Sequence, residues 1–209
     1  MRDLEQLTQA IDLRGKTVVD VGCGDGAFVR ALAEAGADAI GVEVTEAAVA
    51  HARERDPAHR YELGGAERLP LGDKSVDVAT LMRSLHHVPD PASAFGELAR
   101  VVREHVWVAE PLPHGAFFEL LQPVDDETEV RANAQRALAE QDHFERVATV
   151  EYEVPIAIGS LAALRERLLA ADPSRAARFD AVEPRLRELF APGAYVELIR
   201  ADLLRPTSR

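Results

Sequence analysis

Short apolar runs alternate with amphipathic stretches along the first half of the chain. The apolar runs lie at residues 18–21, 39–44, 76–81 and 106–109. Uninterrupted apolar runs of this length are typical of strands that are buried on both faces of a parallel sheet. The segments between the runs have helical spacing of apolar residues, near 27–35, 46–55 and 92–103. Alternating strands and helices predict a layered α/β domain with right-handed crossovers.

The second half of the chain has a weaker and different pattern. Residues 111–126 lose their periodicity around two further prolines, whereas 127–141 regain the spacing of a helix. Residues 148–154 alternate apolar and polar side chains, as in a strand with one solvated face. Two more helices and a last strand are expected near 160–170, 180–190 and 195–204.

A glycine-rich loop follows the first apolar run. Gly22, Gly24 and Gly26 let the backbone turn tightly and approach a bound molecule closely. A strand, a glycine loop and a helix in succession favour a small-molecule site over a purely structural loop. Residues 22–27 also match the dinucleotide pattern G-x-G-x-x-G/A, with Glu43 at a suitable distance for a ribose. Two carboxylates, Asp20 and Asp25, disfavour a pyrophosphate there and favour a ligand with positive charge.

Several further blocks stand in a fixed order after this loop, at 41–45, 65–71, 75–91 and 100–111. Together with residues 18–26 they resemble the class I S-adenosylmethionine-dependent methyltransferases of the small-molecule type. The resemblance covers roughly residues 15–113. It implies a three-layer Rossmann-like α/β sandwich with a mostly parallel, seven-stranded sheet and an antiparallel edge hairpin.

The resemblance also implies a domain organisation. We expect one methyltransferase domain over residues 1–209. Its cofactor-binding core would be 1–113, a lid insertion would span 111–145, and edge strands and helices would fill 146–209. The lid is inferred because only one short helix, around 3–11, fits before the first strand. Phe117 and Phe118 are either the apolar face of this lid or ordinary core residues.

The expected cofactor is S-adenosyl-L-methionine. By resemblance, Glu43 holds the ribose, the end of the first strand and its glycine loop hold the methionine part, and 65–67 lie beside the adenine. The predicted cofactor-binding residues are Asp20, Gly22, Cys23, Gly24, Glu43, Val44, Gly65, Ala66, Glu67 and Met82.

Two features depart from the family pattern, Gly65 and a shortened turn at 103–105 before the fifth strand, and Arg83 is unusual as well. Gly65 stands where many relatives have an aspartate that accepts a hydrogen bond from the adenine, so Ala66 or Glu67 is expected to make this contact instead. Arg83 is unusual in a cavity for a cationic cofactor. We expect it to pair with Asp20 or Glu110, or else to bind an acidic substrate.

Catalytic residues are less defined. His86, His87 and Glu110 are weak candidates for a base near the acceptor, because histidine titrates near neutral pH. The alternative is that the histidines only shape their loop. No metal site is expected, since the chain lacks a helical His-x-x-x-His or a Cys/His cluster at ligand spacing.

Composition narrows the class of partner. The formal net charge of −12 disfavours RNA, and the single cysteine excludes a disulfide within the chain. No apolar run approaches the length of a membrane span, so we expect a cytoplasmic monomer or homodimer that methylates a small molecule. The alternatives are a methyltransferase that acts on a protein or RNA, and a catalytically silent cofactor-binding or regulatory protein.

Overall fold

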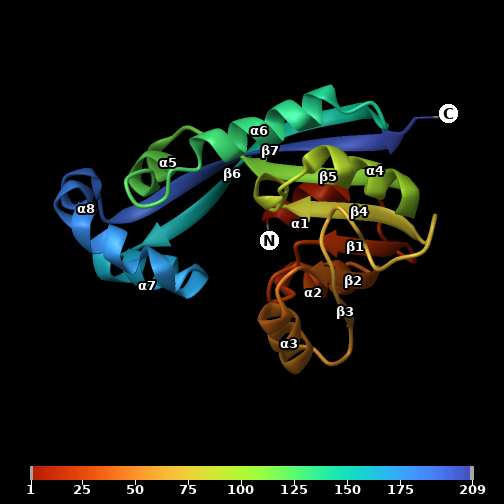
Figure 1. Ribbon diagram of the computed structural model, residues 1–209, viewed down its shortest axis with the longest axis horizontal. Helices are drawn as coiled ribbons and strands as arrows, with labels where there is room; N and C mark the ends of the chain where they lie inside the picture. Colours follow the sequence, from red (N-terminus) through yellow and green to blue (C-terminus); the bar gives the residue numbers. More distant parts are fainter. Residues whose placement is uncertain (1, 208–209) are drawn as a thin grey trace. The chain divides into compact units, whose positions relative to one another are not determined.

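The computed structural model describes residues 2–207 and has the alternating order that the sequence predicts (Figure 1). The strands are β1 (Thr17–Val21), β2 (Asp38–Glu43), β3 (Arg60–Leu63), β4 (Val76–Met82), β5 (Val102–Pro111), β6 (Phe144–Ile158) and β7 (Gly193–Pro206). The α-helices are α1 (Arg2–Ala10), α2 (Ala27–Glu34), α3 (Glu46–Arg55), α4 (Pro91–Val101), α5 (Ala116–Leu121), α6 (Thr128–Glu140), α7 (Leu161–Ala171) and α8 (Ala176–Leu189). No helix among these residues is long and apolar enough to cross a membrane.

The strands form one seven-stranded sheet in the order β3-β2-β1-β4-β5-β7-β6. Strands β1 to β5 pair in parallel, and Val19 of β1 lies between Ile40 of β2 and Ala79 of β4. The edge strands β6 and β7 run in opposite directions (Figure 1), so the sheet is mostly parallel with an antiparallel edge. The predicted Rossmann-like fold class is therefore confirmed.

The order of the strands fixes where a ligand can bind. From β1 the chain moves outward through β2 and β3, and it then returns to the other side of β1 to form β4 and β5. Ligands of such sheets bind at the carboxyl ends of the strands where this reversal occurs. The reversal here lies between β1 and β4, and the glycine loop directly follows β1.

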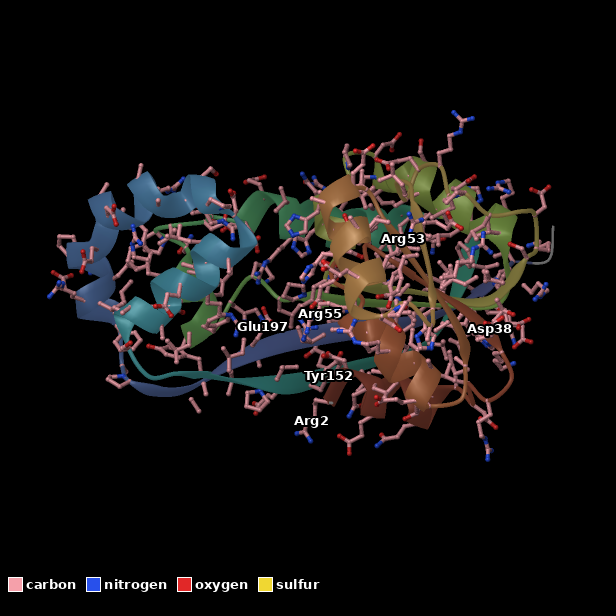
Figure 2. All side chains as sticks on the ribbon, turned by 90° about the horizontal axis from the view of Figure 1, so that it is seen from below. Arg2, Asp38, Arg53, Arg55, Tyr152 and Glu197 are labelled. Atoms are coloured by element: carbon pink, nitrogen blue, oxygen red, sulfur yellow. The ribbon has the colours of Figure 1, made fainter. Side chains whose placement is uncertain are left out.

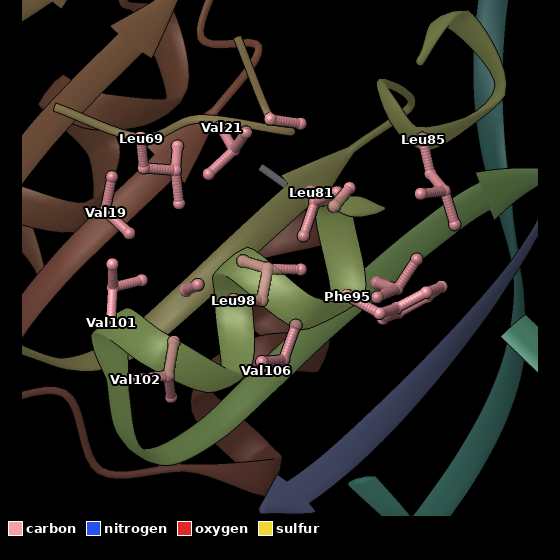
Figure 3. Packing of buried hydrophobic residues seen from close by; sticks show 14 of the residues in the cluster. Val19, Val21, Leu69, Leu81, Leu85, Phe95, Leu98, Val101, Val102 and Val106 are labelled. Carbon is pink, nitrogen blue, oxygen red and sulfur yellow. The ribbon is translucent and has the colours of Figure 1, made fainter. Parts of the chain in front are cut away.

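Helix α4 shows why one face of the central strands is apolar. Phe95 and Leu98 on α4 pack against Leu81 and Val106 of the sheet, and all four side chains are fully buried (Figure 3). Asp90 begins the helix by accepting a hydrogen bond from the Ser93 N–H at 3.2 Å. Burying a side chain of this size stabilises the fold by about 1.5–3 kcal/mol.

The chain divides into two compact units by its internal contacts. Unit 1 comprises residues 1–110, 133–150 and 200–209, and unit 2 comprises 111–132 and 151–199. Unit 2 has its own hydrophobic core, which contains Phe117, Phe179 and Tyr195. The range 111–145, expected as one insertion, is thus shared between the two units.

Three elements differ from the sequence prediction. Strand β3 was not visible as an apolar run, because it is only four residues long and two of them, Arg60 and Glu62, are charged. Helix α5 falls within the stretch that lacks periodicity. The helix expected to reach residue 103 ends at Val101, because Val102 pairs with Val76 and already belongs to β5.

Candidate functional site

The glycine loop leaves β1 in a left-handed backbone conformation. Gly22 and Gly24 have φ values of 78° and 54°, which residues with a Cβ adopt only at a cost. A Cβ on Gly22 would lie 2.6 Å from the Cβ of Ser84, whereas one on Gly24 would meet nothing within 4 Å. Ser84 also donates a hydrogen bond to the Val21 carbonyl at 2.7 Å. The loop is therefore packed tightly against the segment after β4 at Gly22 and is open at Gly24.

Glu43 at the end of β2 connects its own strand to the glycine loop. Its Oε2 accepts a hydrogen bond from the Gly24 N–H at 3.0 Å. Its Oε1 accepts from the Val44 and Thr45 N–H groups at 2.9 and 3.1 Å. A carboxylate held by three backbone donors is fixed in position, and it faces the cavity described below.

Asp20 lies in the interior, at 2% exposure, on β1, two residues before the first glycine of the loop. Its Oδ1 accepts a hydrogen bond from the Thr80 hydroxyl at 2.7 Å. The pKa of this carboxyl is raised to about 7, chiefly by burial; the Thr80 hydrogen bond opposes this rise, and the nearby Glu43 charge adds to it. Asp20 is therefore a group whose charge changes near neutral pH.

The other two polar side chains of the loop point to roles other than ligand binding. Burial, helped by the charge of Asp20, raises the pKa of the Cys23 thiol to about 12, so the thiol stays protonated. Asp25 pairs with Arg55 at 2.6 Å and accepts from the Ala27 N–H at the start of α2. Figure 2 labels Arg55 on α3. Asp25 does not line the cavity described below, and its carboxylate is paired with Arg55.

A cavity of about 320 Å³ lies at the carboxyl ends of β1, β2 and β4, within the size range of small-molecule sites. Its lining residues are Val21, Gly22, Glu43, Val44, Gly64, Gly65, Ala66, Glu67, Arg83, Ser84, His87, Val88 and Pro89.

Most of the predicted cofactor residues meet in this cavity. Gly22, Glu43, Val44 and residues 65–67 line it. The lining does not include Asp20, Cys23, Gly24 or Met82. Val44 is 71% exposed, which is unusual for a valine and leaves its side chain available to an apolar ligand surface.

The segment after β4 contributes residues that sequence reasoning missed. Ser84 and 88–89 line the cavity beside Arg83, which the sequence had already placed there, and only their position after a strand end pointed to them. Gly64 and Val21 were missed because nothing distinguishes them from ordinary strand residues. At Gly65, a Cβ would lie 3.1 Å from the Glu67 Oε2.

Arg83 has a partner that was not expected. Its guanidinium contacts the carboxylate of Asp3 on α1 at 3.1 and 3.3 Å, and the Asp3 side chain is only 9% exposed. The predicted pairing of Arg83 with Asp20 or Glu110 is therefore wrong. The backbone of Arg83 has a φ of 56°, an uncommon value for a residue other than glycine.

The three catalytic candidates lie in two different environments. His87 lines the cavity. His86 and Glu110 are buried, and the His86 Nδ1 is hydrogen-bonded to the Glu110 Oε2. The rings of His86 and His87 are in contact, with centroids 4.0 Å apart.

The residues that line the cavity belong to a stretch of the chain that matches a known protein family. Residues 19–109 match the family model described as "Methyltransferase domain". The chain is 41% identical over 106 residues to an uncharacterized methyltransferase of Mycobacteroides abscessus, across 48% of this chain and 41% of that protein. It is 42% identical over 101 residues to a ubiquinone biosynthesis O-methyltransferase of Thiobacillus denitrificans, across 46% of this chain and 44% of the relative. The chain thus spans less than half the length of these curated relatives.

Solved structures agree with the fold over the whole chain. The YcgJ protein of Bacillus subtilis superposes with a TM-score of 0.68 at 18% identity, and covers 100% of this chain and 99% of its own. An S-adenosylmethionine-dependent methyltransferase of Mesorhizobium loti gives a TM-score of 0.55 at 20% identity, across 95% and 96% of the two chains. At 18% and 20% sequence identity, these structural similarities establish only that the folds agree. Residues 19–109 therefore match a methyltransferase domain, and the chain as a whole has a Rossmann-like fold that it shares with a solved S-adenosylmethionine-dependent methyltransferase.

Proposed function

We propose that this chain transfers the methyl group of S-adenosyl-L-methionine to a small-molecule acceptor. The observation that carries the proposal is the cavity at the reversal of strand order, bounded by the glycine loop and by the fixed carboxylate of Glu43. This cavity lies within the stretch that matches the methyltransferase family. Its volume lies at the lower end of the range for small-molecule sites.

The residues present fit the cofactor. Glu43 is placed to accept from the two ribose hydroxyls, because its carboxylate is already fixed at the cavity wall by three backbone donors. Gly22 lines the cavity, and its backbone would lie beside the methionine part. Val44 and residues 65–67 would flank the adenine. When bound, the cofactor supplies a methyl group on a sulfonium, and the Glu43 and Glu67 carboxylates complement that positive charge.

An acceptor of small size is favoured by two observations. Two of the curated relatives are ubiquinone biosynthesis O-methyltransferases, from Thiobacillus denitrificans and Methylococcus capsulatus, which supports a small molecule that is methylated on oxygen. The net charge of −12 opposes binding to RNA phosphates. The chain's own contribution to the reaction would be to exclude water and align the acceptor, because methyl transfer by displacement depends on alignment.

Calorimetry with S-adenosylmethionine tests the binding part of this proposal through Glu43. The Glu43→Ala variant should bind more weakly by about 1.5–3 kcal/mol, the usual range for hydrogen bonds to a charged group. Glu46→Ala is the matched control, because Glu46 is exposed on α3 and does not line the cavity. Equal affinities of Glu43→Ala and wild type would contradict the proposed ribose contact.

Transfer is tested separately from binding. Wild-type protein is incubated with methyl-labelled cofactor and fractionated metabolite extracts, and the label is followed into small molecules, protein and RNA. Label in a small molecule is expected. Tight binding without transfer to any fraction would instead favour a cofactor-binding or regulatory protein, for which the missing carboxylate at Gly65 is the structural argument.

A further inference from the structure

The segment after β4, residues 83–88, is held at each of its first four residues. The Arg83 N–H donates to the Ala109 carbonyl at 2.8 Å, and the Ser84 hydroxyl donates to the Val21 carbonyl at 2.7 Å. The Leu85 N–H donates to the Glu110 Oε1 at 2.8 Å. The His86 Nδ1 meets the other oxygen of the same carboxylate, Oε2. Glu110 therefore makes two of the four anchoring contacts.

The place of Glu110 in the sheet is unusual for a carboxylate. It ends a run of buried apolar residues on β5, and its own exposure is 1%. A buried charge is costly unless its oxygens are hydrogen-bonded, and here each oxygen has a donor. An ionised Glu110 only accepts hydrogen bonds, and in that state the hydrogen in the contact with His86 lies on Nδ1. With an ionised Glu110, the contact thus fixes the tautomer of the His86 imidazole.

The effect of Glu110 reaches the cavity through its neighbours. His86 is in ring contact with His87, at 4.0 Å between centroids and 47° between planes. His87 and Ser84 line the cavity, whereas Glu110 and His86 do not. Glu110 therefore acts through other residues and would not itself touch a ligand.

We propose that Glu110 is a positioning residue for the cofactor and acceptor cavity. By accepting from the Leu85 N–H and the His86 Nδ1–H, it fixes residues 83–88 in the shape that places Ser84 and His87 at the cavity wall. The part of this inference that concerns ligands rests on the proposed function. The part that concerns the imidazole does not.

Two variants separate the two hydrogen bonds. In Glu110→Gln the amide oxygen still accepts from Leu85, but the amide N–H₂ faces His86 and needs an acceptor there. Glu110→Ala removes both contacts. Glu104→Gln is the matched control, because Glu104 lies on the same strand, is partly exposed and pairs with Lys16 away from the cavity.

The first measurement needs no ligand. Long-range ¹H–¹⁵N correlation of the imidazoles, with the His86 signals assigned by their loss in His86→Gln, should show the hydrogen on Nδ1 in wild type and in Glu104→Gln. In Glu110→Gln it should move to Nε2. An unchanged His86 spectrum in a folded Glu110→Gln would overturn the proposal.

The second measurement is the affinity for S-adenosylmethionine, beside circular dichroism and melting temperature. Glu110→Ala should bind about tenfold more weakly, because a buried hydrogen bond to a charged group is lost, and Glu110→Gln should keep part of the affinity. An affinity equal to that of wild type in a folded Glu110→Ala would overturn the positioning role. Failure of the wild type to bind would instead reject the proposed function, and the imidazole measurement would still decide the inference.

Discussion

The two units of the chain encode their structures in different ways. In unit 1, individual residues are required both for the packing of the fold and for the shape of the site. Gly22 leaves no space for a side chain beside Ser84, and Glu43 joins the end of one strand to the loop of another. In unit 2, large side chains such as Phe117 and Phe179 form a core in which many sequences of similar volume would be accepted. The family match follows this difference, because it covers residues 19–109 and stops before unit 2 begins.

The comparison teaches which features persist between distant relatives. A cofactor shared by many enzymes is bound by backbone turns and strand ends, which tolerate few substitutions. A core that requires only buried apolar side chains of suitable volume produces a much weaker sequence pattern. The predictions below test how independent the two units are and how strictly unit 1 is constrained.

The largest effect is expected in unit 2, from replacing Phe117 and Phe118 with alanine. Both rings are buried. Phe117 contacts Tyr195, and Phe118 lies beneath the Arg131 guanidinium. Each truncation should cost about 3–5 kcal/mol of unfolding free energy, as in other emptied core sites.

Thermal and urea unfolding measure this loss, with Val130→Ala as the control because Val130 is 40% exposed in the same unit. Cofactor affinity should stay nearly unchanged, since all residues that line the cavity belong to unit 1. A parallel loss of cofactor affinity would show that the two units are not independent.

An intermediate effect is expected from Asp20 in unit 1, through pH. Burial raises its folded-state pKa to about 7, above the ordinary value of 3.8. The native state therefore keeps a proton that the unfolded chain has already lost. This contribution to stability is fully present below pH 3.8 and is lost as the pH rises through about 7.

The Asp20→Asn variant stays neutral and can still accept from the Thr80 hydroxyl. It should match wild type near pH 4 and exceed it near pH 8 by roughly 2–4 kcal/mol, since one pKa unit corresponds to about 1.4 kcal/mol. Urea titrations across this range measure the difference. Asp38→Asn is the control, because Asp38 is exposed at the start of β2 (Figure 2). A difference that does not change with pH would rule out the titration of Asp20.

The smallest effect is expected at Gly65. A Cβ there would lie 3.1 Å from the Glu67 Oε2, so Gly65→Asp alone would bring two carboxylates together and should not tighten the cofactor. Combined with Glu67→Gln, it should tighten binding by about 1 kcal/mol, the value of one hydrogen bond. Calorimetry of both variants, with Gly65→Ala to isolate the added Cβ, measures this. Tightening by Gly65→Asp alone would show that Glu67 moves aside without cost.

Much of unit 1 was predictable from the sequence because its signals are local. The position of Glu43 follows from counting along one strand, and the turn at Gly22 follows from the glycines themselves. The contact of Arg83 with Asp3 joins residues 80 positions apart, and no local pattern indicates it. The same holds for Ser84 against Gly22, which depends on β4 lying beside β1.

Unit 2 was less predictable for a physical reason. Helix α5 has only six residues, too few for a helical period to become visible in the sequence. Strand β6 extends from residue 144 to 158, although only its middle alternates clearly. In unit 2, the burial of a side chain depends on contacts with residues distant in the sequence, such as Phe117 with Tyr195. The sequence therefore left open whether Phe117 and Phe118 belong to a lid or to a core.

The burial of Cys23 gives the chain a built-in reporter. Cys23 is the only cysteine, and its thiol lies at 7% exposure between the glycine loop and β2. A shielded, protonated thiol reacts slowly with alkylating or disulfide reagents, so its labelling rate follows the fraction of time that the loop is open. Pulsed labelling at increasing ligand concentration then reads the opening free energy of the loop directly in unmodified protein, without a dye and without an engineered site.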